Sequence, residues 1–433
     1  MGDDEKQVLL NQKKEFSRSI SHTKDELQSF RSCLRWMCVD QSNPWWASLS
    51  WLLFFLLAII VPILSHFWLA CADCDGKLHR PYDGVLQLSL TSIATVSFLC
   101  LSKFVRKYGL RRFLYLDKLC DESEKVRQGY TAQLHRSLKL LAFFVLPCFA
   151  LEAAYKIWWY SSGASQIPFL GNVYLSDAIA CILELSSWLY RTSIFFLVCV
   201  LFRLICYLQI LRLQDFAQVF QEESDVGSVL KEHLRIRRHL RVISHRYRAF
   251  ILSALIIITA SQFASLFNTT RSHDVSIYRA GELALCSLTM MAGLFILLRS
   301  ATKITHKAQS ITCLAAKWHI CATLDSFDGT DSETPLTQIV SNERLFSMNI
   351  GGESDDDDAG DEDDDINTTK IIIPAFAHTV SFQKRQALVT YFENNRAGIT
   401  VFGFMLDRTY MHTIFGIELS LVLWLLGKTI GIS

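Results

Sequence analysis

Seven apolar blocks divide the chain, and each is about as long as the hydrocarbon layer of a bilayer. A helix needs roughly 20 apolar residues to cross that layer. Hydrophobic residues make up 51% of the sequence and charged residues only 20%, a balance typical of membrane proteins. We therefore expect an all-α membrane protein with seven transmembrane helices. The blocks lie at residues 47–70, 84–101, 137–154, 177–210, 250–267, 277–298 and 409–426.

The basic residues near the ends of the blocks predict the orientation. Cytoplasmic connections of membrane proteins hold an excess of Lys and Arg. On one side, residues 1–46, 103–136 and 212–246 hold seven, nine and seven such residues, whereas the three connections on the other side hold at most two each. The N-terminus is therefore expected in the cytoplasm and the short C-terminal tail outside. This orientation is the reverse of that of a G-protein-coupled receptor. No cleaved signal peptide is expected, because a polar segment precedes the first block.

The cytoplasmic connections keep a helical pattern. Apolar residues continue at helical spacing after the fourth block, break at 225–228, and resume before the fifth block. The same spacing continues after the sixth block as far as Trp318. Helices four to six are therefore expected to extend into a packed cytoplasmic subdomain. A further helix is predicted in "TVSFQKRQALVTYFENNRAG", with Asn394, Asn395 and Gly398 as its stop signal.

A strongly acidic stretch interrupts this pattern before the last block. The run "GGESDDDDAGDEDDD" contains ten carboxylates, which repel one another and cannot bury enough apolar surface to fold. We interpret residues 326–369 as a disordered cytoplasmic insert. A calcium site is the alternative, but the glycine and ligand spacing of an EF-hand loop is missing.

Five segments follow from these patterns. They are a cytoplasmic N-terminal segment at 1–46, helices one to six with their extensions at 47–325, the acidic insert at 326–369, a cytoplasmic helix leading to the last span at 370–406, and the last helix with a short outer tail at 407–433.

The end of the chain resembles a known group of receptors. The stretch "GITVFGFMLDRTYMHTIFGIELSLVLWLLGK" is similar to the terminal signature of insect odorant and gustatory receptors, in which a phenylalanine and a glycine precede a Leu-Asp-Arg-like turn and the pore helix. The whole chain, with "RPYDGVLQLSL" in its second span and its acidic insert, more closely resembles the plant gustatory-receptor-like proteins, long catalogued as a domain of unknown function. The resemblance covers most of residues 45–433.

The resemblance implies a function for the isolated last helix. The insect members are tetrameric ligand-gated cation channels. Each subunit gives its last helix to a central pore, a cytoplasmic anchor domain joins the subunits, and the ligand enters a pocket in the outer half of spans one to six. Here Ser420, Leu421 and the pair Gly427-Lys428 depart from the insect pattern. These departures predict altered ion selectivity, and they keep a non-conducting receptor or scaffold of the same fold as the alternative.

The register of the last helix predicts which residues face the pore. At about 100 degrees per residue, one stripe follows Trp424, while Glu418 lies some 120 degrees away. In a tetramer, four Trp424 rings would form an apolar constriction and four Lys428 ammonium groups would repel cations. The alternative is that the stripe packs against its own bundle, with Lys428 reaching the headgroups. The predicted pore-lining residues are Tyr410, Thr413, Ile417, Ser420, Leu421, Trp424 and Lys428.

Ionisable and aromatic residues near the outer ends of the spans suggest a ligand site. Glu184 and Arg191 are seven residues apart on one face of span four, and we expect them to form a structural ion pair, since charge in hydrocarbon is costly. A pocket for a small organic ligand is predicted near the outer ends of spans one and three, with an interfacial aromatic belt as the alternative. Its candidate residues are His66, Trp68, Glu152, Tyr155, Trp158 and Trp159.

The cysteines and histidines give little support for a metal site. Cys71 and Cys74 are expected outside and are close enough in sequence for a local disulfide, whereas zinc would need more ligands than His79 nearby. His233, His239 and His245 fall six residues apart, on different helical faces. We expect no bound metal and no cofactor.

The remaining function classes are disfavoured. The sequence shows no nucleophile motif and no paired intramembrane carboxylates, so we expect no enzyme, and it shows no repeated halves of a transporter. The expected partners are the lipid bilayer, further copies of the chain in a homotetramer and an unknown small-molecule ligand, with no nucleic acid. The expected location is the plasma membrane, with an endomembrane as the alternative.

Overall fold

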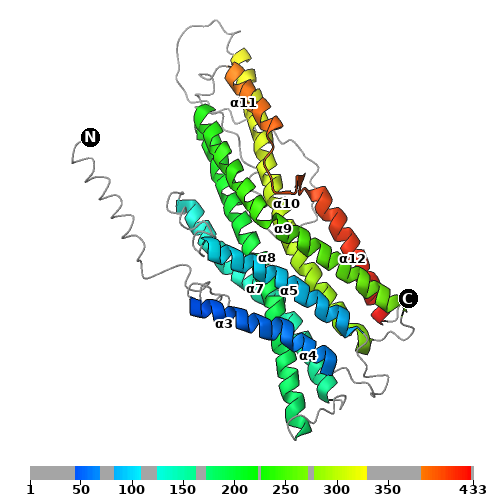
Figure 1. The fold of residues 1–433 in the computed structure, drawn as a ribbon. Coiled ribbons are helices and arrows are strands. Elements are labelled where there is room, and N and C mark those ends of the chain that lie inside the picture. The colour runs from blue at the N-terminus through cyan, green and yellow to red at the C-terminus, as the bar shows by residue number, and fades with distance from the viewer. Residues whose placement is uncertain are drawn as a thin grey trace, which may run out of the picture.

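Seven long apolar helices make up most of the protein. The structure is a computed structural model that describes residues 44–68, 82–108, 124–161, 172–222, 226–271, 277–328 and 382–430. Within these residues, seven helical stretches are long and apolar enough to cross a membrane. They form one elongated bundle (Figure 1). The prediction of an all-α protein with seven transmembrane helices is confirmed.

The seven spans follow the predicted blocks. The first span is one continuous helix that includes a π-helical segment. Pro147 lies within the third span, and the helix continues past it. Spans one to three are α3 (Pro44–Phe54) with η2 (Phe55–Ile60) and α4 (Val61–Trp68), α5 (Asp83–Tyr108), and α7 (Glu124–Ser161). Spans four to six are α8 (Val173–Glu222), α9 (Val226–Arg271) and α10 (Ile277–Asp328), and span seven is α12 (Arg408–Ile430).

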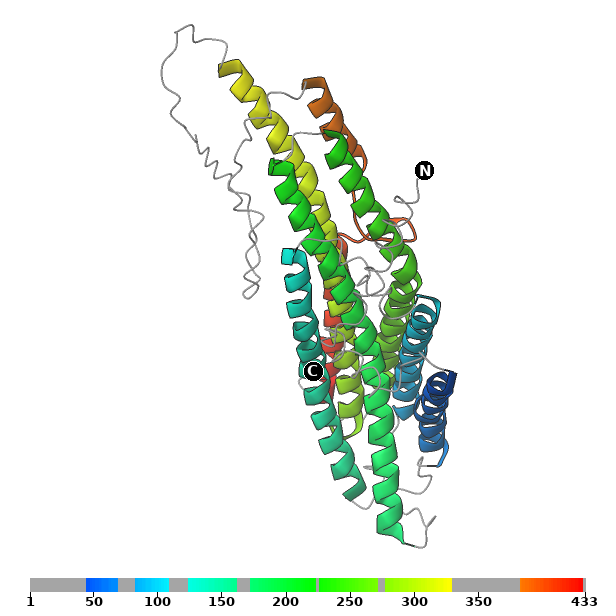
Figure 2. The same cartoon turned by 90° about the vertical axis from the view of Figure 1, so that its left-hand side faces the viewer.

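Helices α8, α9 and α10 are far longer than a bilayer requires. They contain 50, 46 and 52 residues, which is about 70–78 Å at ~1.5 Å per residue, against a hydrocarbon layer of ~30 Å. Figure 2 shows their extended ends rising together beyond the remaining spans. The predicted helical extensions are therefore present. Helix α10 continues to Asp328, slightly past the predicted boundary at 325.

A short helix closes the extended end. Helix α11 (Phe382–Asn394) packs against two of the long helices, α9 and α10. Its Phe392 ring lies 4.5 Å from the ring of His233 in α9, and Phe382 lies 5.1 Å from His319 in α10. Arg237 of α9 also donates a hydrogen bond of 2.7 Å to Asn395. We call α11 and the parts of α9 and α10 that it contacts the distal bundle.

A tight hairpin joins the distal bundle to the last span. Strands β1 (Thr400–Val401) and β2 (Phe404–Met405) pair antiparallel. Between them, Phe402 and Gly403 have φ values of 49° and 94°, as in the two-residue turns that match strand twist. The sequence analysis did not predict these strands. Since the backbone N–H groups of Ile399 and Thr400 donate to Thr305 and Ser244, each at 3.1 Å, the hairpin is held by both α10 and α9.

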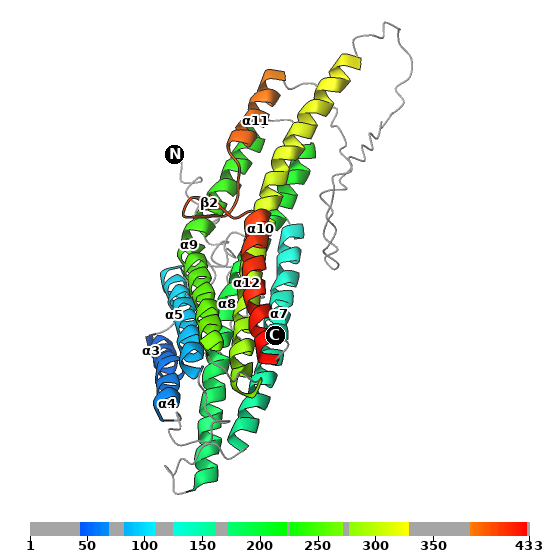
Figure 3. The same cartoon turned by 90° about the vertical axis from the view of Figure 1, so that its right-hand side faces the viewer.

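The core lies around α8. In the most apolar 18-residue stretch of its span 83% of the residues are buried, against 17% in that of α12. Helices α5, α7 and α10 surround α8, and Figure 3 shows α12 running beside the lower part of α10, beneath the distal bundle. The architecture therefore contains a central helix covered by the others and a last helix on the outside.

We expect Gly293→Ala to destabilise the contact between α10 and α8. A Cβ atom at Gly293 would lie 2.2 Å from Cε1 of Phe195, and that ring is 1% exposed. Small residues let membrane helices approach closely, and overpacking costs about 1–3 kcal/mol. Thermal unfolding of the detergent-purified protein measures the effect. Gly416→Ala is the control, because its Cβ would meet nothing within 4 Å; equal melting temperatures for the two variants would contradict this close packing.

Some predictions fall outside the described residues. These are the acidic run at 353–365 with nearly all of the predicted insert, and the Cys71–Cys74 pair. The side chain of Trp68 also lies outside them.

Candidate functional site

Three carboxylates surround one ammonium group inside the bundle. The Nζ atom of Lys156 in α7 lies 2.7 Å from Glu282 Oε1 in α10 and 2.9 Å from Glu184 Oε2 in α8. Glu152, one helical turn earlier on α7, approaches the same Nζ at 3.7 Å. All four side chains are buried, with at most 7% exposed. We call these residues the charge cluster.

The charge cluster fixes the relative positions of four spans. A buried charge requires partners because its desolvation is costly, and Lys156 finds them on its own helix and on two others. Ser65 of α4 also donates a hydrogen bond to Glu184. Among the described residues, both carboxylate oxygens of Glu152 lack a hydrogen-bond donor. The cluster thus combines structural ion pairs with buried acceptor atoms that have no hydrogen-bond donor.

Glu184 and Arg191 do not bond to each other in the structure. Glu184 meets Lys156, whereas the Arg191 guanidinium donates to the carbonyl of Ser187 at 3.3 Å and, across the helix contact, to Thr91 Oγ1 at 3.2 Å. A further bond of 3.5 Å reaches the carbonyl of Gln87. The two side chains do share one face of α8, as their spacing predicted. Their partners differ because α7 supplies a cation to Glu184 and α5 supplies oxygen acceptors to Arg191.

The expectation that no intramembrane carboxylates meet was wrong. Glu152, Glu184 and Glu282 come from three helices and converge on Lys156. The i, i+4 spacing of Glu152 and Lys156 was a signal in the sequence for part of the cluster. Lys156 lies just past the end predicted for the third apolar block, so its burial was missed.

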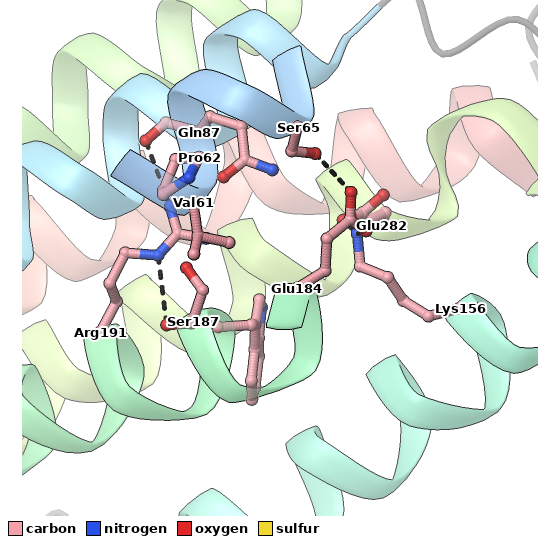
Figure 4. Close-up of a pocket in the computed structure, with 10 residues that line it drawn as sticks. Val61, Pro62, Ser65, Gln87, Lys156, Glu184, Ser187, Arg191 and Glu282 are labelled. Carbon is pink, nitrogen blue, oxygen red and sulfur yellow. Dashed lines mark hydrogen bonds and ion pairs between the residues drawn. The ribbon is translucent and has the colours of Figure 1, made fainter. Parts of the chain in front are cut away.

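A narrow cavity adjoins the charge cluster. It contains about 210 Å³ of space not filled by protein atoms, part of it open to the outside. Figure 4 shows Lys156 meeting carboxylates at one end and Arg191 forming hydrogen bonds at the other. Among the described residues, Gln87 Oε1 and Trp188 Nε1 are buried lining atoms without a hydrogen-bond partner. The lining of the cavity therefore contains donors, acceptors and both signs of charge.

The predicted pocket residues do not form one pocket. Glu152 belongs to the charge cluster, and Trp159 is buried with its ring 4.9 Å from Tyr160. Tyr155 packs 6.2 Å from the exposed ring of Trp158. His66 is exposed and lies 3.3 Å from Asp83. None of the predicted residues whose side chains the structure describes is among the described residues that line the cavity.

The last helix turns one face away from the rest of the chain. Of the seven predicted pore residues, five are exposed, and Leu421 and Lys428 are half-buried. The opposite face packs inward: Glu418 is 1% exposed and accepts a hydrogen bond from Thr259 of α9. Within the described residues, the predicted stripe therefore does not serve mainly to pack α12 onto its own bundle. The five exposed residues are Tyr410, Thr413, Ile417, Ser420 and Trp424.

Comparison with known proteins places the chain in a family. Residues 25–417 match the profile of a family described as "Protein of unknown function (DUF3537)". The chain belongs to the DUF3537 family. No curated protein matches this DUF3537 sequence. Among solved structures, the insect olfactory receptor OR5 from Machilis hrabei is similar, with 12% sequence identity and a TM-score of 0.47 over 93% of this chain and 99% of the receptor chain.

The DUF3537 match covers most of the candidate site. It includes all four residues of the charge cluster and the first part of α12, ending at Ile417. Ser420, Trp424 and Lys428 lie beyond it. The buried polar interior therefore belongs to the matched region, whereas the C-terminal half of the predicted pore stripe does not.

Proposed function

We propose that this DUF3537 protein is a homotetrameric receptor in which the α12 helices line a central ion pore and a small molecule beside the charge cluster controls opening. The observation that carries the proposal is the exposed face of α12, together with the 17% burial of the most apolar stretch of its span. A helix that lines a shared pore must offer most of its surface to other copies of the chain and to water. The resemblance of the C-terminal sequence to insect odorant and gustatory receptors supports the same assignment.

The composition of the exposed face distinguishes α12 from a lipid-facing helix. Helix α7 is also mostly exposed, but it exposes large apolar side chains such as Phe143 and Leu146. The outward face of α12 combines apolar side chains such as Trp424 with the hydroxyl groups of Thr413 and Ser420. Small and polar residues are enriched where membrane helices meet each other or water. This difference favours a protein-facing and pore-facing position for α12.

The contacts of α10 provide a route from the cavity to the pore. Helix α10 contributes Glu282 to the charge cluster. Farther along, its Phe295 ring lies 4.8 Å from Phe415 of α12, and Thr302 lies 3.3 Å from Met411 of α12. A ligand that displaces Glu282 would therefore act on a helix packed directly against the pore helix. Such a direct contact gives the ligand site and the pore helix one shared element, α10, whose position both could bias.

The proposed orientation places the distal bundle in the cytoplasm and Lys428 at the outer mouth. The excess of basic residues in 1–46, 103–136 and 212–246 supports this orientation. In a tetramer the distal bundles would anchor the subunits to one another, as the resemblance implies. Lys428 ammonium groups around the outer mouth would repel cations and favour a closed or anion-tolerant pore. A non-conducting receptor of the same fold is the alternative that this charge favours. We propose the plasma membrane as the location.

Disulfide crosslinking tests the assembly without knowledge of the ligand. Ser420→Cys places a thiol on the exposed face of α12, and oxidation in native membranes should produce crosslinked dimers on a denaturing gel, since facing helices approach one another around the pore. Leu146→Cys is the matched control, because it is 61% exposed on α7 and would face lipid. The wild-type protein gives the background from native cysteines. Crosslinking at Leu146 but not at Ser420 would show that α12 does not lie at the subunit interface.

A further inference from the structure

A cleft with basic walls lies between α7, α8 and α10. It contains about 590 Å³ of space not filled by protein atoms, part of it open to the outside. Four cationic side chains line it: Arg136, Arg203, Arg299 and Lys303. The described lining residues include no Asp or Glu. We call it the basic cleft.

The basic cleft lies at the opposite membrane level from the charge cluster. On α10, Arg299 comes 17 residues after Glu282, and on α8, Arg203 comes 19 residues after Glu184. These separations amount to roughly 26–29 Å at ~1.5 Å per residue, close to the ~30 Å thickness of hydrocarbon. The cleft therefore lies where the headgroups of the leaflet nearer the distal bundle are found. In the proposed orientation this is the cytoplasmic leaflet.

The chemistry of the walls selects a phosphate group. Guanidinium groups bind phosphate oxygens through paired N–H donors, and ammonium groups add point charges. The buried Gln133 and Ser300 and the half-buried Tyr207 also line the cleft, so it offers neutral hydrogen-bonding groups in addition to charge. Basic pockets between transmembrane helices on the cytoplasmic side bind phosphorylated lipid headgroups.

The arrangement goes beyond ordinary interfacial lysines and arginines. Cations at helix ends commonly extend singly along the membrane surface to reach water, and Lys139 is an example, since it is exposed on α7 and is not a lining residue. The four basic residues of the cleft instead come from three helices and converge on one space. A common anionic ligand explains this convergence, because it would bind all three helices at once.

We propose that the basic cleft binds a phosphorylated anionic group, supplied either by a phosphoinositide lipid or by a free phosphate ester. Bound there, the ligand would hold α7 and α8 against α10, which also packs on α12. Binding does not depend on conduction, so the proposal stands apart from the proposed channel. The predicted orientation determines only which leaflet supplies the lipid, and the rest of the proposal does not depend on it.

The test is a binding measurement on the full-length protein in detergent micelles. Fluorescence anisotropy would follow a labelled short-chain phosphatidylinositol bisphosphate, competed by the same lipid without the label, inositol trisphosphate, inorganic phosphate or short-chain phosphatidylcholine. The variant Arg136→Gln/Lys303→Gln removes two cleft charges from α7 and α10. The control Lys139→Gln/Lys317→Gln removes two exposed charges from the same helices, outside the described lining. At about 1 kcal/mol per basic residue, the cleft variant should weaken binding about tenfold to thirtyfold, and the control less than about twofold.

The outcomes separate the sources and the alternatives. Competition by inositol trisphosphate as strong as by the unlabelled lipid supports a soluble phosphate ester, and competition by the lipid alone supports a membrane source. The proposal is overturned if the labelled lipid does not bind to the protein and no phosphorylated compound competes for the cleft. An equal loss of affinity in the cleft and control variants also overturns the proposal, because such a result would show that general surface charge attracts the lipid. Melting temperatures near that of the wild-type protein would show that both variants are folded.

Discussion

Replacing Trp424 with alanine is expected to let ions pass through the protein without any ligand. The Trp424 ring is 40% exposed on the outward face of α12, and rings from four subunits would form an apolar constriction that closes a pore by excluding water. Alanine removes the ring and leaves room for water. We expect ligand-independent flux through vesicles reconstituted with the purified variant to rise at least about tenfold, which corresponds to lowering the barrier by ~1.4 kcal/mol.

Leu423→Ala is the matched control for this measurement. Leu423 is the preceding residue on α12 and is 58% exposed, but it lies about 100 degrees away around the helix, outside the predicted pore stripe. Its truncation should leave the flux at the wild-type level. If both variants assemble and insert into the vesicles yet neither conducts, the pore assignment fails, and the non-conducting receptor becomes the better description.

The sequence predicted the spans and the long helices well because these features depend on local signals. Apolar block length indicates where a helix lies in a bilayer, and helical spacing continues visibly past span six to Trp318, well within α10. The stop signal at Asn394 and Asn395 likewise coincides with the end of α11. Each of these signals is contained within a few helical turns of the chain.

The charge cluster could not be predicted in the same way. Helical spacing shows which residues share a face, but it does not show which helix lies opposite. Lys156 and Glu282 are 126 residues apart in the sequence, and only the packing of α7 against α8 and α10 brings them together. The same reasoning placed Glu184 and Arg191 correctly on one face and gave them the wrong partners.

The hairpin before α12 was missed because tertiary contacts outweigh local preference there. Phe402 has a φ of 49°, a conformation that bulky residues rarely adopt. The Arg248 guanidinium lies 5.1 Å from the centre of its ring, and Ser244 and Thr305 accept hydrogen bonds from the neighbouring backbone. Gly403, with a φ of 94°, was the one local sign of a turn.

Replacing Lys156 with methionine is expected to cause the largest loss of stability. Methionine keeps the length of the apolar stem but removes the cation that lies within 4 Å of all three carboxylates. Removing one partner from a buried ionic group typically costs 3–5 kcal/mol, and we expect a loss of about that size. Thermal unfolding of the detergent-purified protein at neutral pH measures it. A melting temperature equal to that of the wild-type protein would show that Lys156 does not hold the carboxylates in place.

Two further variants separate charge from packing. Lys139→Met changes an exposed lysine of the same helix and should alter stability by no more than about 0.5 kcal/mol. Combining Lys156→Met with Glu152→Gln, Glu184→Gln and Glu282→Gln removes every charge of the cluster and should restore most of the lost stability, because uncharged replacements of buried ionic groups are often neutral or stabilising. A quadruple variant that is as stable as the wild-type protein but no longer responds to ligand would show that the charges serve binding. If it is instead as unstable as Lys156→Met, the ammonium group is required for packing itself, and the charge cluster is then a structural element of the bundle.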